Sequence, residues 1–316
     1  MSSPYASLPK RVAVAAAAIP VILWLAFQGG YYFFAFVALA SSLALIEFYR
    51  LAEAKGAFPL TIVGVLFGFI VNAAFIYDRL HLQVLGMFAS LGIQLSMFSL
   101  LQFVVFVLLV FIITVGLVEL FRQKGSPLLN AGMTIAGVLF VSLFFGTLIE
   151  IRELFPYGFP VGKFFPNVVA TETQLAQISQ WGGYTVISIF VTIWICDTAA
   201  YFGGTTLGRH KLFERVSPNK TWEGAVFGLV FAVLTMILAQ ETVLDYLTVS
   251  QAVTMGTIVG IFGQLGDLVE SRFKRDAGVK DSSSFLPGHG GVYDRFDSLI
   301  FVSPILYLYI DFVVLS

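Results

Sequence analysis

Residues 31–48, "YYFFAFVALASSLALIEF", form a nearly unbroken run of apolar and small side chains. A helix needs about 20 mainly apolar residues to cross a bilayer, so this run predicts a membrane span. Residues 10–27, "KRVAVAAAAIPVILWLAF", precede it and resemble a secretory signal peptide, because a basic pair is followed by an apolar stretch. The second run follows after only a few residues, so two spans joined by a tight turn are the better interpretation. We expect the N-terminal segment to be retained.

Similar runs recur along the whole chain of 316 residues. Hydrophobic residues make up 58% of it, charged residues 12%, and the mean hydropathy is +0.89. Soluble globular domains carry about 25% charged residues. The net charge of −1 argues against a nucleic-acid partner, since such proteins have a basic surplus. The single cysteine, Cys196, excludes an internal disulfide and a cysteine-rich metal site. The composition predicts an all-α, polytopic integral membrane protein.

Hydropathy leaves the stretch 84–120 ambiguous, because it is too long for one span and rather short for two. A single crossing with 84–96 at the membrane interface keeps the basic loops on one side, so nine transmembrane helices are expected. Nothing in the intervening segment 150–181 suggests chemistry, and its three prolines predict an external loop. The expected spans are 12–28, 31–48, 58–77, 98–120, 129–149, 183–203, 222–241, 251–269 and 297–315.

The basic residues indicate the orientation, because Lys and Arg near span ends favour the cytoplasm. With nine spans, all of the 18 Lys and Arg except Arg79, Arg152 and Lys163 fall on the side of the N-terminus. We therefore expect a cytoplasmic N-terminus and an external C-terminus. Residues 1–182 would form a scaffold with a lipid groove, and residues 183–316 a catalytic region.

Charges gather in two segments on the predicted cytoplasmic side. Segment 196–224 begins with Asp197 inside a span and ends with Glu223, and segment 266–298 begins with Asp267 in the last turns of a span. An ionised carboxylate within a span is costly, and is a functional candidate for that reason. These three acids are candidate metal ligands.

Carboxylates in the second segment recur at helical spacing. Asp267 and Glu270 are three residues apart, and Asp294 and Asp297 repeat this spacing. Mg²⁺ is usually held by one or two carboxylates together with waters and substrate phosphates, so these oxygens could bind it. The alternative is that Asp294 pairs with the adjacent arginine and Asp297 caps the last span. Asp267 has no cation near it in sequence, which favours a ligand role.

Basic residues and glycines lie among these acids. The basic residues could be only the positive-inside signal, or could attract anionic lipids. The glycines of "PGHGG", residues 287–291, let backbone amides approach an anion, although a plain turn is the alternative. His289 suits a phosphate hydrogen bond or proton transfer better than zinc, because nearby zinc ligands are too few. The candidates for binding anionic oxygens are Ser217, Asn219, Lys220, Lys274, Arg275, Lys280, Gly288, Gly290, Gly291 and Arg295.

The combination of cations, metal-binding acids and a phosphate cradle at a membrane face suits phosphoryl or nucleotidyl transfer. This chemistry consists mainly of positioning and charge stabilisation. The sequence contains no Ser-His-Asp order, no cysteine nucleophile and no Walker A pattern.

Residues 271–297 resemble the signature of the phosphatidate cytidylyltransferase (CDP-diacylglycerol synthase) family throughout. Residues 197–224 resemble the family's first loop, "DTxAYxxGxxxGKxKLxxxISPxKTxEG", with Thr205 standing where relatives often have a basic residue. The specific resemblance covers 183–300, and the N-terminal spans are similar only in hydropathy. The signature positions are Ser271, Phe273, Lys274, Arg275, Lys280, Asp281, Ser283, Leu286, Pro287, His289, Gly290, Gly291, Val292, Asp294, Arg295, Phe296 and Asp297.

The resemblance implies a Mg²⁺-dependent inner-membrane enzyme, a homodimer, that makes CDP-diacylglycerol and pyrophosphate from CTP and phosphatidic acid. It points to Asp267 and Asp294 as ligands of a two-metal centre in which K⁺ can accompany Mg²⁺. Ser271 would lie at the substrate, and Asp281 and His289 would orient partners.

Two other functions stay open at this point. A CTP-dependent polyprenol or phytol kinase would use the same nucleotide but release CDP rather than pyrophosphate. An ion-coupled transporter would use Asp197, Asp267 and Asp311 as coupling groups, although transporter sites usually lie near the bilayer midplane within repeats, and no repeat is visible here.

Overall fold

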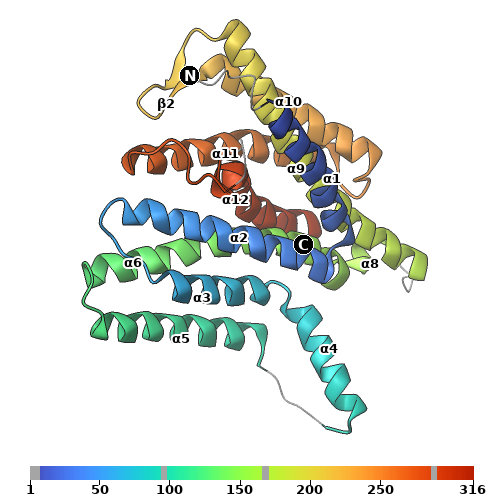
Figure 1. Cartoon of the computed structure of the whole chain (residues 1–316). Helices are drawn as coiled ribbons and strands as arrows, with labels where there is room; N and C mark the ends of the chain where they lie inside the picture. Colours follow the sequence, from blue (N-terminus) through green and yellow to red (C-terminus); the bar gives the residue numbers. More distant parts are fainter. Residues whose placement is uncertain (1–7, 94–97, 166–170, 286–289) are drawn as a thin grey trace.

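The computed structural model describes residues 8–93, 98–165, 171–285 and 290–316, and the chain there is almost entirely helical (Figure 1). π-Helical turns at Val138–Ser142, Leu154–Gly158 and Ile310–Leu315 continue α6, α7 and α12. Two short strands, β1 (Lys211–Phe213) and β2 (Ser217–Thr221), pair antiparallel. The helices are α1 Leu8–Gln28, α2 Gly30–Glu53, α3 Thr61–Ala74, α4 Tyr77–Ser90, α5 Leu100–Phe121, α6 Pro127–Gly137, α7 Leu143–Glu153, α8 Val161–Phe164, α9 Glu172–Leu207, α10 Trp222–Thr242, α11 Val249–Asp276 and α12 Tyr293–Tyr309.

Within the described residues, seven helical segments are long and apolar enough to cross a membrane. They confirm the prediction of an all-α polytopic membrane protein. The expected count of nine is not confirmed, because these seven segments include neither α1 nor the 14-residue α3. The seven segments are Gly30–Glu53, Leu100–Phe121, Pro127–Gly158, Glu172–Leu207, Trp222–Thr242, Val249–Asp276 and Tyr293–Leu315.

A sharp break separates α3 from α4. The two helices differ in direction by 78°, and together they count as an eighth candidate span that is broken or re-entrant. In Figure 1, α4 points away from the helices around α3. The prediction that 84–96 lies at the membrane interface stays a prediction, and residues 94–97 lie outside the described part of the chain.

Two predicted loops contain more regular structure than expected. The prediction of a loop over 150–181 is wrong for most of it, because the helix before it continues to Gly158 and α9 begins at Glu172. Pro156 lies in the π-helical turn that ends this helix at Gly158. The helix therefore ends later than hydropathy suggested. In segment 196–224, α9 runs on to Leu207 and the β1–β2 hairpin follows.

Three of the long helices begin at capping boxes. Ser99, Thr171 and Thr248 each accept a hydrogen bond from the backbone N–H three residues later, and the glutamine at that position accepts one from the cap residue's own N–H. These bonds satisfy amides that have no acceptor within the helix, which explains where α5, α9 and α11 begin.

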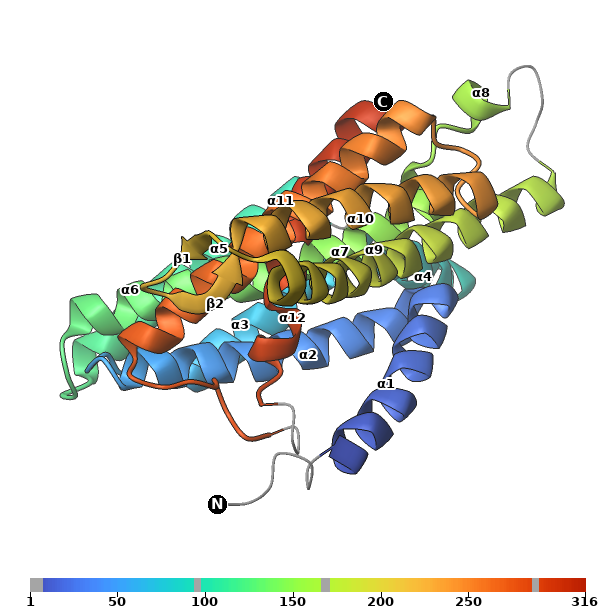
Figure 2. The ribbon, with the colours of Figure 1, turned by 90° about the horizontal axis from the view of Figure 1, so that it is seen from above.

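The N-terminal and C-terminal helices pack together rather than forming separate bodies. Figure 1 shows α5, α3 and α2 stacked in that order, with α12 and α11 beyond α2. Helix α12 packs against both α7 and α11, and α1 packs against α9. Figure 2 shows most of the long helices running in similar directions, with α1 splayed away at one side.

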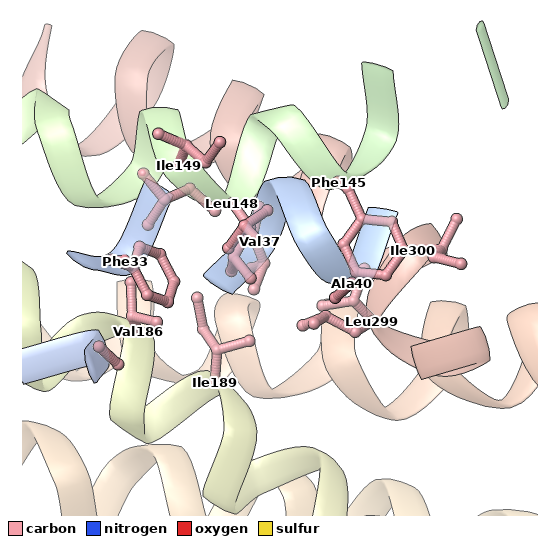
Figure 3. Packing of buried hydrophobic residues seen from close by; sticks show 14 of the residues in the cluster. Phe33, Val37, Ala40, Phe145, Leu148, Ile149, Val186, Ile189, Leu299 and Ile300 are labelled. Atoms are coloured by element: carbon pink, nitrogen blue, oxygen red, sulfur yellow. The ribbon is translucent and has the colours of Figure 1, made fainter. Parts of the chain in front are cut away.

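The apolar core lies where α2, α7, α9 and α12 meet (Figure 3). Its members are almost completely shielded, as close packing of large side chains requires. They include Phe33 and Val37 of α2, Phe145 and Leu148 of α7, Val186 and Ile189 of α9, and Leu299 and Ile300 of α12.

Polar contacts identify the two ends of the bundle. At one end, Lys55 after α2 pairs with Asp276 of α11 at 3.5 Å, and Arg122 donates to the carbonyl of Phe58. These segments therefore share one side, as the distribution of basic residues predicted. At the other end, Arg79 pairs with Glu153 at 2.9 Å.

Glycines let α9, α10 and α11 approach closely, as is typical of helices packed in a membrane. A Cβ atom on Gly256 of α11 would lie 2.6 Å from the Cα of Val233 and 2.9 Å from the carbonyl oxygen of Ala232, both on α10. A Cβ atom on Gly228 of α10 would lie 3.0 Å from the carbonyl oxygen of Cys196 on α9.

We predict that Gly256→Val lowers the free energy of unfolding by about 1–3 kcal/mol, because its side chain meets backbone that can move only if α10 and α11 separate. Thermal unfolding in detergent measures this effect. Gly116→Val on α5 is the matched control, since nothing lies within 4 Å of its added Cβ. Equal midpoints for the two variants would show that the close approach of α10 and α11 is unimportant for stability.

Candidate active site

The two charged segments meet at one cavity of about 1130 Å³. The ends of α9 and α11, the hairpin, and the starts of α10 and α12 supply its polar wall. Helices α1, α2 and α9 supply an apolar wall that includes Ile19, Leu39, Leu43 and Trp194. The predicted site residues that line the cavity are Asp197, Asn219, Lys220, Asp267, Lys274, Asp294, Arg295 and Asp297.

Three carboxylates of α11 and α12 form a compact group. Asp267, Glu270 and Asp297 each offer an oxygen, and these oxygens lie within 4.8 Å of one another. The two helices come together at Gly266, where a Cβ would lie 2.7 Å from the carbonyl oxygen of Asp297. Asp197 lines the same cavity but is not part of this group. Asp297 lies inside α12, which begins at Tyr293, so the alternative prediction that it caps the last span is wrong.

Lysines from both segments neutralise these acids. The Lys220 Nζ lies 2.6 Å from Asp267 Oδ2. Asp267 has no cation near it in sequence, and its partner comes from the other charged segment. The Lys274 Nζ lies 2.6 Å from Glu270 Oε2 and 2.8 Å from Asp294 Oδ1. The Lys274 contacts join α11 to α12, and the Lys220 contact joins the hairpin to α11.

Asp294 makes contacts that the sequence did not suggest. It lies outside the three-carboxylate group and pairs with Lys274 rather than with the adjacent Arg295. It also accepts hydrogen bonds from the backbone N–H and Oγ of Ser282 and from the Gly291 N–H at 2.7 Å. These contacts make Asp294 an anchor for the backbone before α12.

The contacts of Asp294 require glycine at the positions just before α12. Gly290 has φ +80°, and its Cβ would lie 2.7 Å from Asp294 Oδ2. The Gly291 N–H, predicted to bind phosphate, is donated to Asp294. The predictions for Gly288 and His289 lie outside the described residues.

In the first segment, Glu223 supports the hairpin. Its carboxylate accepts hydrogen bonds from the backbone N–H groups of Arg209 and His210 and contacts His210 Nδ1 at 2.6 Å. The structure therefore separates Glu223 from the three-carboxylate group. Ser217 begins β2, and Thr205, which offers no positive charge, donates within α9 to backbone carbonyls.

The other described candidates in the second segment, apart from those that line the cavity, lie outside its lining. The Ser271 Oγ donates to Asp267 Oδ1 at 3.2 Å and so orients that acid. Arg275 donates to the carbonyl of Val279, and Lys280 and Asp281 are exposed.

Sequence reasoning missed Glu47 of α2. Glu47 is 3% exposed and accepts hydrogen bonds from residues on both sides of the "PGHGG" stretch. Glu47 lies within a predicted apolar span, where an ionised carboxylate is costly to bury. An acidic residue in such a span was the sequence signal that could have identified it.

Comparison with known proteins agrees with these motifs. The model of the Cytidylyltransferase family matches residues 9–313. A phosphatidate cytidylyltransferase of Staphylococcus haemolyticus (strain JCSC1435) is 47% identical over 125 residues, which cover 40% of this chain and 48% of the relative. The protein of the same name from Staphylococcus aureus (strain COL) is 48% identical over 126 residues, with the same coverage. The chain thus aligns with about half the length of these curated relatives. Since the family model covers nearly the whole chain, the chain belongs to the Cytidylyltransferase family.

Proposed function

We propose that the protein is a phosphatidate cytidylyltransferase, which converts CTP and phosphatidic acid into CDP-diacylglycerol and pyrophosphate. The observation that carries this proposal is a single cavity with an apolar wall on one side and paired acids and lysines on the other. Such a cavity suits a substrate with hydrocarbon chains and a phosphate head. The names of the staphylococcal relatives support the same activity.

The apolar wall would hold the lipid part of the substrate. Ile19 and Ile22 of α1 face the same cavity as Leu39 and Leu43 of α2, and Trp194 of α9 lies along it. Ile19 and Leu39 are exposed in the protein alone, which suits contact with acyl chains of a substrate or of the bilayer. A lipid lying here would place its phosphate toward the charged wall.

The group of Asp267, Glu270 and Asp297 fits a hard divalent cation such as Mg²⁺, because carboxylate oxygens are the ligands that it prefers. The buried Glu270 Oε1 has no hydrogen-bond partner among the described residues. Mg²⁺ held there would draw charge from the triphosphate and the leaving pyrophosphate. We also propose K⁺ as the second cation that the family resemblance implies.

In the proposed reaction, a phosphatidate oxygen attacks the α-phosphorus of CTP. A new P–O bond forms as the bond to the oxygen bridging the α- and β-phosphorus breaks, and pyrophosphate leaves with that electron pair. The attacking phosphate oxygen is already anionic near neutral pH, so no strong base is needed. The protein contributes position and positive charge.

Lys220 and Lys274 are the lysines best placed to supply that charge, since both line the cavity and already contact the acids. Arg295 lines the cavity and is exposed, so it is open to a phosphate. Arg275 and Lys280 are more peripheral cations in the same proposal. Other residues that we propose to contact or orient the substrate are Ser217, Asn219, Ser271, Asp281 and the backbone at Gly290.

We propose that the polar end of the cavity faces the cytoplasm, where CTP is available, and that the enzyme works as a homodimer in a bacterial inner membrane. The basic segments around Lys55, Arg122 and the end of α11 lie at this end, which supports the orientation through the positive-inside rule. The dimer rests on the family resemblance alone.

The product of the reaction tests the proposal directly. Purified protein in detergent is incubated with phosphatidic acid, Mg²⁺ and CTP labelled on the α-phosphate. We expect label to enter the lipid phase while pyrophosphate is released. Label recovered in water as CDP, with alcohol lipids as acceptors, would instead identify a lipid kinase. CTP that stays intact with every lipid would contradict both enzymes and favour transport.

Metal dependence should follow the three-carboxylate group. We expect a chelator to abolish activity and Mg²⁺ to restore it, and Asp297→Asn to raise the Mg²⁺ concentration for half-maximal activity by about 10- to 100-fold. Titration of activity with Mg²⁺ measures this shift. Asp311→Asn, which removes a carboxylate in the last turns of the chain, is the control. An unchanged Mg²⁺ requirement in Asp297→Asn would place the metal elsewhere.

We propose different roles for Asp267 and Asp294. We expect Asp294→Asn to lower the free energy of unfolding by about 3–5 kcal/mol, because it breaks a buried ion pair and turns an amide donor toward backbone donors. Asp267→Asn removes the ion pair with Lys220, in which the Asp267 side chain is one-third exposed to solvent. It should therefore lower the free energy of unfolding by about 1 kcal/mol or less and still abolish turnover. Thermal unfolding without ligands measures both. Equal losses of stability would show that the two acids are not used differently.

A further inference from the structure

Glu47 lies near the end of α2 and accepts four hydrogen bonds from the opposite end of the sequence. Its Oε1 accepts from the Ser283 Oγ at 2.5 Å and the Val292 N–H at 3.1 Å. Its Oε2 accepts from the Ser282 Oγ at 2.9 Å and the Tyr293 N–H at 2.8 Å. All four partners are donors, which suits a carboxylate, an acceptor at both oxygens when ionised.

Two of these donors belong to the start of α12. The first backbone N–H groups of a helix have no acceptor within it, and a negative charge beside them is favourable. Val292, the residue that precedes α12, makes no side-chain cap of its own. Glu47 therefore caps α12 from a different helix.

The close approach of Glu47 also explains why residue 291 is glycine. An added Cβ on Gly291 would overlap the Glu47 Oε2 and the Ser282 Oγ. Ser282 is shared between Glu47 and Asp294, at 2.9 and 3.0 Å. The two acids thus hold the backbone on both sides of residues 284–290.

The first turns of α12 also carry the groups assigned to the reaction. Arg295 and Asp297 follow Tyr293 in that helix, and Asp297 completes the group with Asp267 and Glu270. A shift of the helix start would move these side chains relative to α11. By contrast, Glu47 itself does not line the cavity among the described residues.

We propose that Glu47 is a positioning residue of the active site. It fixes the start of α12, and through it sets Asp297 and Arg295 against α11. This inference rests on the proposed nucleotidyl transfer for its kinetic consequences, but its structural consequence is independent of the reaction.

The variant Glu47→Gln keeps the size of the side chain but turns an amide donor toward two of the four donors. We expect it to lower kcat/KM for CTP by about 10- to 100-fold and to raise the Mg²⁺ concentration for half-maximal activity. The Mg²⁺ requirement distinguishes positioning from instability, because loss of folded protein lowers the amount of active enzyme without changing the metal affinity of the rest.

Hydrogen exchange gives a readout that needs no activity. We expect faster exchange in Glu47→Gln at the amides of residues 290–295, with unchanged exchange in α9 and α10. If wild-type protein makes no CDP-lipid, the proposed function fails while exchange still tests the role of Glu47. Wild-type kinetics, Mg²⁺ requirement and exchange in Glu47→Gln would overturn the inference.

Glu119→Gln is the matched control. Glu119 is also a buried carboxylate, 6% exposed, but it pairs with Arg122 and Asn130 away from the cavity. We expect it to leave the Mg²⁺ requirement and exchange at 290–295 unchanged. If Glu47→Gln does not fold, Ser283→Ala removes a single donor and should give a smaller change in the same direction, about tenfold or less. Ser283→Ala indistinguishable from wild type in both measurements would then contradict the proposal.

Discussion

A charge held among the helix ends of a membrane protein is costly unless it has a partner, and this requirement organises the polar end of the bundle. Lys220 of the hairpin meets Asp267 of α11, and Lys274 of α11 meets Glu270 in its own helix and Asp294 of α12. Because the partners come from different segments, the ion pairs that make these charges tolerable also assemble the site. The groups proposed for chemistry are therefore also groups that hold α11, α12 and the hairpin together.

Much of this site could be predicted from sequence, because its residues lie in two short segments where charge is otherwise scarce. Asp267 and Glu270 share a helical face, and their spacing alone brings them together. The pairing of Asp267 with Lys220 could not be predicted, since nothing in one sequence states which loop faces which helix. Glu47 could have been singled out as an acid within an apolar span, but its role could not be predicted, because its partner Ser282 lies 235 residues later.

The fold, like the site, could be predicted only in part from the sequence. Apolar runs identified the seven long helical segments, because burial in lipid requires length and hydrophobicity that are visible in sequence. The 78° break between α3 and α4 was missed, because hydropathy does not report the direction in which a helix runs. The helical residues around Pro156 and at Glu172 were also missed, because prolines and polar residues resemble a loop when packing is unknown.

The contact between Glu47 and the start of α12 has a consequence for biosynthesis. Synthesis at about 5–20 residues per second separates the emergence of Glu47 from that of Ser282, 235 residues later, by roughly 10 to 50 seconds. During that interval α2 carries a carboxylate whose four final donors have not yet been made. Until then this group needs water, lipid head groups or a proton to offset its charge, and its final contacts form only once the start of the last helix has been made.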